Sequence, residues 1–228
     1  MCSSDLFPEA AENRLVDETI VDMTGEGPAR VEVVQRPSGR WDPLLRRTYG
    51  GDETARAAAV ERTLSRRFGA VVGTPEATHP DYEALDMGFQ LRMSAAVEKV
   101  GRPSDGGLEL PSSLAPDELL KRAAPESTRD TDLLLGMPWL AERRVVYRLP
   151  RGSRVFDLPG SLELETEDMS YSRAVSAVPT ETALEIVVVE RMEQRSHRVP
   201  ADRYEAFREA ARDIDRAQAE SIEVEVIR

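Results

Sequence analysis

Apolar and polar residues alternate along much of the chain, which is the period of strands with one buried face. Val31 and Val33 alternate with charged neighbours, and Leu162 and Leu164 do the same. The longest apolar stretches, such as 184–189, have the length of a strand. Short strands separated by Gly- and Pro-containing turns are typical of antiparallel sheets. The pattern therefore predicts a mainly β fold.

Two segments instead carry apolar residues at spacings of three and four, which predicts amphipathic helices. The first covers 52–68, with Asp52 as its N-cap and a glycine directly after it. The second covers 202–219, where Asp202 and Glu205 match an N-terminal capping pair. Each helix is expected to pack its apolar stripe against a sheet.

The fold class that follows is mainly β with α, in two antiparallel β-sandwich-like units with one packed helix each. The first domain covers 7–100 and the second covers 131–228, which ends in a helix and a strand. Region 101–130 is rich in Gly, Pro, Ser and Asp and is predicted to connect them. Segment 41–49 is expected to be a strand of the first unit, with Pro43 placing it at an edge or bulge.

Composition narrows the function classes. The chain has 228 residues with 40% apolar and 32% charged residues, which is a globular composition. Its net charge of −12 opposes contact with phosphate backbones and anionic lipid, so we expect no nucleic-acid partner and no membrane partner. No apolar run approaches the length of a transmembrane helix, and no signal-peptide pattern opens the chain.

The first six residues are predicted to be foreign to the natural protein. Codons for Cys2–Leu6 can be written as TGC TCT TCC GAT CT, which is the end of a common sequencing adapter. On this hypothesis 1–6 is an artefact, the reading frame is a fragment, and the natural N-terminus lies upstream. The alternative is a natural Ser-rich tail. If Cys2 is not native, cysteine usage gives no information on the redox compartment.

No group of residues matches a catalytic signature. Cys–His catalysis needs a thiolate beside a base, and Cys2 is the one cysteine. His79 and His197 are the two histidines, neither lies in a nucleophile elbow, and both are predicted to be surface residues. Phosphate-binding glycine motifs do not occur. We therefore assign no catalytic, cofactor-binding or metal-binding residue, expect no cofactor, and predict that the chain is not an enzyme.

Acidic clusters are the remaining candidates for a metal site or for carboxylate catalysis. Calcium needs oxygen ligands around a tight turn, whereas one cluster alternates along a predicted strand and the other lies in a polar loop. Among 42 acidic residues the sequence does not select a catalytic pair. We therefore interpret both clusters as solvated. They consist of Glu163, Glu165, Glu167 and Asp168, and of Glu126, Asp130 and Asp132.

Trp41 and Trp139 are the two large aromatic anchors of the chain. Core or interdomain packing is the favoured interpretation for both, and a platform for a ligand is the alternative.

Several segments of the second half together carry a family resemblance. The segments are Tyr147–Pro159, Met169–Tyr171, 184–189, Val199–Arg208 and Asp213–Ala217. They resemble the C-terminal region of large bacterial transglutaminase-like proteins that also carry domains of unknown function. Upstream, Tyr49–Gly51 and the Ala- and Arg-rich helix after it are similar to the unit that follows the catalytic core in these proteins.

The resemblance implies a papain-like catalytic core flanked by β-sandwich domains, with its Cys, His and Asp upstream of this chain. It carries no catalytic residue over, and it implies a periplasmic or extracellular parent that the residues themselves do not indicate. We expect a non-catalytic accessory region that supports or orients that upstream core, which would be its partner.

Two alternatives remain open. The first is an independent β-sandwich module that binds a ligand or a protein, and an exposed apolar patch or an aromatic-lined groove near Trp41 or Trp139 would favour it. The second is a hydrolase that uses a buried carboxylate pair in a pocket.

Overall fold

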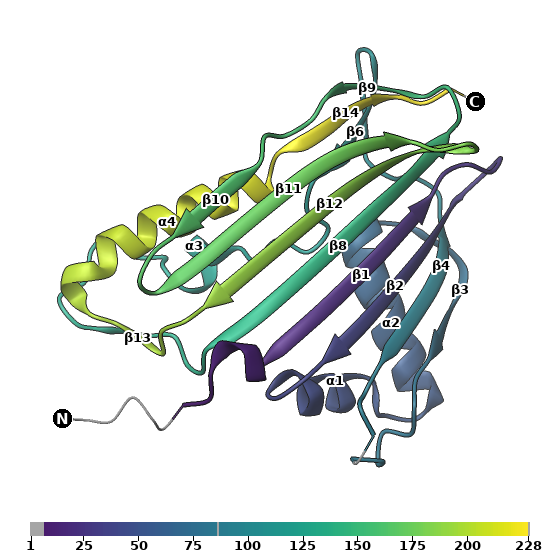
Figure 1. Cartoon of the computed structure of the whole chain (residues 1–228). Helices are drawn as coiled ribbons and strands as arrows, with labels where there is room; N and C mark the ends of the chain where they lie inside the picture. Colours follow the sequence, from purple (N-terminus) through teal and green to yellow (C-terminus); the bar gives the residue numbers. More distant parts are fainter. Residues whose placement is uncertain (1–6, 86, 228) are drawn as a thin grey trace.

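The computed structural model describes residues 7–85 and 87–227, so the predicted adapter segment 1–6 lies outside the described residues. Its largest feature is an eight-stranded sheet (Figure 1). The order across the sheet is β10 (Leu162–Glu165), β11 (Met169–Pro179), β12 (Ala183–Gln194), β8 (Trp139–Pro150), β1 (Arg14–Asp22), β2 (Ala29–Pro37), β4 (Leu91–Val97) and β3 (Val71–Thr78).

The mainly β class with α is confirmed, but the sheets are arranged differently from the expected two antiparallel units. Strands of both predicted domains lie in the one sheet, and β1 pairs with β8 in parallel, from Arg14 opposite Leu140 to Asp22 opposite Arg148. Every other neighbouring pair of this sheet is antiparallel. Alternation predicts that a segment is a strand, but it does not select the distant strand with which that segment pairs.

Two long helices cover one face of this sheet, and the other face is turned toward the viewer in Figure 1. They are α2 (Glu53–Phe68) and α4 (Tyr204–Gln218), which confirms a helix in each predicted segment. Asp52 caps α2 as expected, because its Oδ1 accepts a hydrogen bond from the Ala55 amide at 2.8 Å. Gly69 ends α2 with φ of 79°, a backbone conformation that glycine adopts without strain.

Smaller elements complete the fold. A four-stranded sheet has the order β5 (Arg102–Ser104), β6 (Gly107–Pro111), β14 (Ser221–Glu225) and β9 (Arg154–Asp157). A two-stranded sheet pairs β13 (Arg198–Val199) with β7 (Leu133–Leu134). Short helices are η2 (Ala10–Glu12), α1 (Trp41–Tyr49), α3 (Leu119–Arg122) and η3 (Ala201–Arg203). Because β6 and β14 pair, the expected connection and the end of the chain share one sheet.

Two local predictions were wrong. Segment 41–49 is helix α1, since Pro43 is tolerated in the first turn of a helix and Leu45 and Tyr49 share its buried side. Asp202 does not cap α4, because it lies within the 3-10 turn η3. Among the described residues, no side-chain hydrogen bond caps η3 or α4.

Apolar side chains beneath the sheet form two cores. The first contains α2 together with the inner faces of β1, β2 and β4, and it extends to Val145 and Val188. The second contains α3 and α4 together with Tyr171 and Met192. Each helix therefore packs in its own core, although both cores lie under the same sheet.

Candidate functional site

A line of polar side chains crosses the inner face of the sheet between the two cores. We call it the buried charged row, and its members are opposite one another on five adjacent strands. Along β12, Glu190 separates Val188 of the first core from Met192 of the second, and Arg173 separates Val175 from Tyr171 on β11 in the same way. The row consists of Gln35, Asp17, Arg143, Glu190 and Arg173.

Asp17 lies next to Gln35, which ends the row, and it is held by α2. Arg67 donates to both of its carboxylate oxygens, at 2.9 and 2.5 Å, and Gln35 donates at 2.8 Å. Burial would raise the pKa of the Asp17 carboxyl, but the Arg67 charge and these hydrogen bonds outweigh it and hold the pKa below 3.8. Asp17 is therefore an ionised buried acid that joins β1, β2 and α2.

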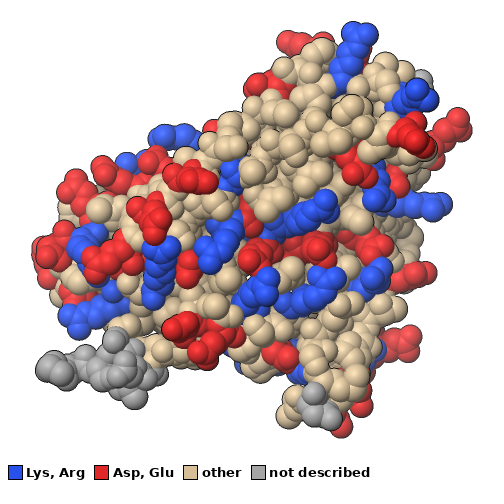
Figure 2. Space-filling model, in the orientation of Figure 1, with Lys and Arg blue, Asp and Glu red and all other residues tan. Residues whose placement is uncertain are grey.

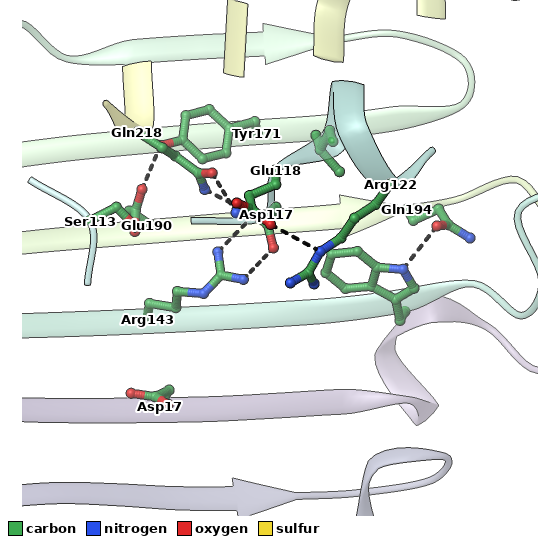
Figure 3. A network of polar contacts seen from close by, with 12 residues as sticks. Asp17, Ser113, Asp117, Glu118, Arg122, Arg143, Tyr171, Glu190, Gln194 and Gln218 are labelled. Atoms are coloured by element: carbon green, nitrogen blue, oxygen red, sulfur yellow. Dashed lines mark hydrogen bonds and ion pairs between the residues drawn. The ribbon is translucent and has the colours of Figure 1, made fainter. Parts of the chain in front are cut away.

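Arg143 occupies the centre of the row and reaches out of the sheet to the segment before α3 (Figure 3). Its guanidinium donates to both oxygens of Asp117, at 2.9 and 2.5 Å. Gln218 of α4 donates to Asp117 at 2.9 Å and accepts the Asp117 amide at 2.8 Å. Burial lowers the pKa of Arg143, but the Asp117 carboxylate outweighs it and raises the pKa above its usual value.

Glu190 is bound by hydroxyl groups (Figure 3). Tyr171 donates to it at 2.6 Å and Ser113 at 2.9 Å. Burial and the adjacent Glu190 both raise the pKa of Tyr171, so its hydroxyl stays protonated as a donor. Arg173 ends the row, where it donates to Glu220 at 2.6 Å and to the Gly160 carbonyl at 2.9 Å.

This geometry bears on the carboxylate-hydrolase alternative. The buried carboxyls are those of Asp17, Asp168 and Glu190. Asp17 and Glu190 are bonded as described above, and Asp168 lies 3.1 Å from a guanidinium nitrogen of Arg203. In the described chain no hydrogen bond joins two of these three carboxyls. The buried charged row therefore has the geometry of a structural charge network that links the two cores.

A cavity of about 320 Å³ lies beside the row, and both tryptophans border it. The Trp41 and Trp139 rings pack edge to face with centroids 6.0 Å apart, which confirms the expected packing between the two halves. Trp41 donates its indole N–H to the Asn13 carbonyl at 3.0 Å, and Trp139 donates to Gln194 at 2.9 Å. Exposed Leu134 borders the same cavity.

The other residues singled out in the sequence lie elsewhere. His79 packs at a tilt against Tyr82, and His197 stacks on Phe7, so each histidine contacts an aromatic ring. Within 7–85 and 87–227 no group of three or more His, Cys, Asp or Glu side chains is arranged to hold a metal ion. Members of both acidic clusters pair with arginines, as Glu165 does with Arg195. The prediction that both clusters are solvated was wrong for Asp168, which is buried.

The outer face of the sheet carries rows of opposite charges (Figure 2). We call it the open face; it is the side of the sheet away from α2 and α4. Four ion pairs cross between neighbouring strands, and at its centre Arg144 is exposed and makes no ion pair with any described residue. The four pairs are Arg14–Glu142, Arg36–Glu18, Arg92–Glu32 and Arg148–Glu185.

Comparisons with protein-family models, with curated proteins and with solved structures found no match. None of the helices in the described chain is both long enough and apolar enough to cross a bilayer.

Proposed function

We propose that this chain is a non-catalytic accessory β region that holds a partner protein domain on the open face of its sheet. The observation that supports this proposal is that one face of the sheet is uncovered. Both long helices pack on the opposite side, so the open face spans the central strands without a covering layer among the described elements (Figures 1 and 2).

The composition of the open face supports a protein as the partner. Its cations are all arginines, since the two lysines of the chain, Lys99 and Lys121, lie outside the sheet. Arginine is enriched and lysine depleted where proteins bind one another. Val189 is 46% exposed and lies opposite Arg144 on the neighbouring strand, so an apolar side chain adjoins the unpaired cation.

Paired charges make the open face suitable for a polar protein surface of mixed charge. The cross-strand pairs fix the direction of each side chain, and they leave Arg144 able to meet a carboxylate of the partner. Such pairing sets the register of two surfaces more than it adds affinity. From the resemblance to transglutaminase-like proteins, we propose a papain-like core of the same parent as this partner.

The test begins with the DNA that precedes the codon of Phe7. The domain encoded there is expressed separately, and its binding to the 228-residue chain is measured by calorimetry. Arg144→Glu is expected to weaken binding at least tenfold, because an arginine hot spot at the centre of an interface contributes about 2 kcal/mol or more. Arg66→Glu is the matched control, since Arg66 is exposed on α2 and undergoes the same change of charge.

The proposal is contradicted if the upstream DNA encodes no papain-like core or if the encoded core does not bind. It is also contradicted if both variants weaken binding equally. Equal weakening would mean that overall charge rather than the open face governs the contact.

A further inference from the structure

We infer that the cavity bordered by Trp41 and Trp139 is a binding site for an apolar side chain that carries a carboxylate beside it. The inference rests on the walls of this cavity and is independent of the open face. N-acyl amino acids and the C-terminal residue of a polypeptide share this chemistry.

The walls come from segments far apart in the sequence. Leu15 lies on β1, Trp41 opens α1, Leu119 opens α3 and Trp139 opens β8. The volume of about 320 Å³ is at the lower end of the range for ligand pockets, which suits one side chain and not a large cofactor. Indole and leucine side chains favour an apolar group, aromatic or branched, in this space.

The polar groups of the wall already have hydrogen-bond partners within the protein. Asp117 is bonded to Arg143 and to Gln218, and Gln194 accepts from Trp139 and donates to the Ser196 carbonyl at 3.2 Å. A polar ligand placed deep in the cavity would find few unoccupied partners and would lose its hydration. The wall therefore selects an apolar group.

Arg122 is the exception. It borders the cavity, its side chain is 66% exposed, and its Nε lies 3.5 Å from a carboxylate oxygen of Glu118. No described residue accepts a hydrogen bond from its two terminal nitrogens, so both can donate to a carboxylate. A ligand whose apolar group enters the cavity would place an adjoining carboxylate next to Arg122 at the rim.

The apolar surface continues outside the cavity. Leu134 is 75% exposed and Met137 is 44% exposed. A free N-acyl amino acid would leave both side chains in water, whereas a polypeptide could cover them. This difference separates the two sources of the ligand chemistry experimentally.

Intrinsic fluorescence gives a direct measurement, because Trp41 and Trp139 are the only tryptophans of the chain. N-acetyl-leucine, N-acetyl-leucinamide and N-acetyl-aspartate are titrated against the full chain. We expect a saturable change with the first two and none with N-acetyl-aspartate. The acid should bind about two- to fivefold more tightly than the amide, which is the effect of one exposed ion pair.

Three variants test the assignment. Arg122→Gln should remove the preference for acid over amide, whereas Lys121→Gln, with the same charge change on a neighbouring residue outside the cavity wall, should keep it. Ala123→Leu places a larger side chain in the cavity and should weaken acid and amide equally. Circular dichroism of each variant checks folding. If Ala123→Leu does not fold, Arg122→Gln still tests the inference, because it changes only an exposed side chain.

A tetrapeptide Gly-Gly-Gly-Leu distinguishes the sources. Tighter binding than that of N-acetyl-leucine assigns the site to chain termini, and equal or weaker binding assigns it to free N-acyl amino acids. The inference is overturned if N-acetyl-leucine gives no saturable change, if N-acetyl-aspartate binds equally well, or if both charge variants lose the preference to the same degree. None of these results depends on a partner at the open face.

Discussion

Charged side chains under the sheet differ from those on its open face mainly in their access to water. The Asp17–Arg67 pair is buried, with side chains 7% and 10% exposed, whereas the Glu32–Arg92 pair is largely exposed. Asp17→Asn leaves the Arg67 guanidinium without its anion, so we expect a loss of about 3–5 kcal/mol in the free energy of unfolding. Glu32→Gln should cost at most about 1 kcal/mol. Urea unfolding measures both, and equal losses would contradict the assignment.

Acid should remove the contribution of Asp17 to stability. The pKa of this carboxyl is below 3.8 in the folded protein, and the unfolded chain titrates near that value. A depressed pKa stabilises the fold above the unfolded pKa, and the stabilisation is lost as the pH falls through the folded pKa. The difference in unfolding free energy between the wild type and Asp17→Asn should therefore be constant above about pH 5 and shrink below pH 4. A difference that grows on acidification would contradict this sign.

Among the elements, α3 depends on a cap supplied by another helix. Asp215 of α4 accepts the amides of Leu119 and Leu120 at 2.7 and 2.9 Å. Asp215→Ala should destabilise the protein by about 1–2 kcal/mol and speed amide exchange at both leucines. Asp213→Ala, on the same helix but exposed, is the control and should leave these amides unchanged. Equal exchange in the two variants would show that the cap contributes nothing.

The sequence predicts elements where the signal is local. Helix α2 follows from apolar spacing and the Asp52 cap, and β10 follows from the alternation of Leu162 and Leu164 with charged neighbours. The sequence predicts a strand where α1 lies, because Pro43 fits an edge strand, although proline also suits the first turn of a helix. The parallel pairing of β1 with β8 depends on residues more than 100 positions apart, and no local pattern specifies it.

The sequence carries a weak signal for the buried charged row. On β12, Glu190 takes the place of an apolar residue in the alternation Leu184, Ile186, Val188, and on β8 Arg143 precedes Val145 on the same face. Charges at positions predicted to be buried mark polar networks, because an unpaired buried charge is too costly. Some of their partners, such as Asp117, lie in loops, so apolar periodicity does not predict them.

At the scale of the molecule, a shared sheet couples two cores that alternation alone would assign to separate domains. Strands β8 and β12 supply side chains to both cores. The buried charged row binds α2 through Asp17, and Arg143 at its centre is joined through Asp117 to the end of α4. If one core opened while the other stayed folded, charged members of the row would lose their partners in the opened core. Because buried charges without partners are costly, this partial opening is disfavoured.

We therefore expect the chain to unfold as one cooperative unit. Native-state hydrogen exchange should give the most protected amides of α2 and of α4 the same opening free energy, equal to that of global unfolding. Arg143→Leu at the centre of the row leaves Asp117 without its guanidinium partner and should lower both values together. Arg144→Leu, the next residue but on the open face, should change neither by more than about 0.5 kcal/mol. If Arg143→Leu lowers the value for one helix alone, the two cores are independent despite the shared sheet.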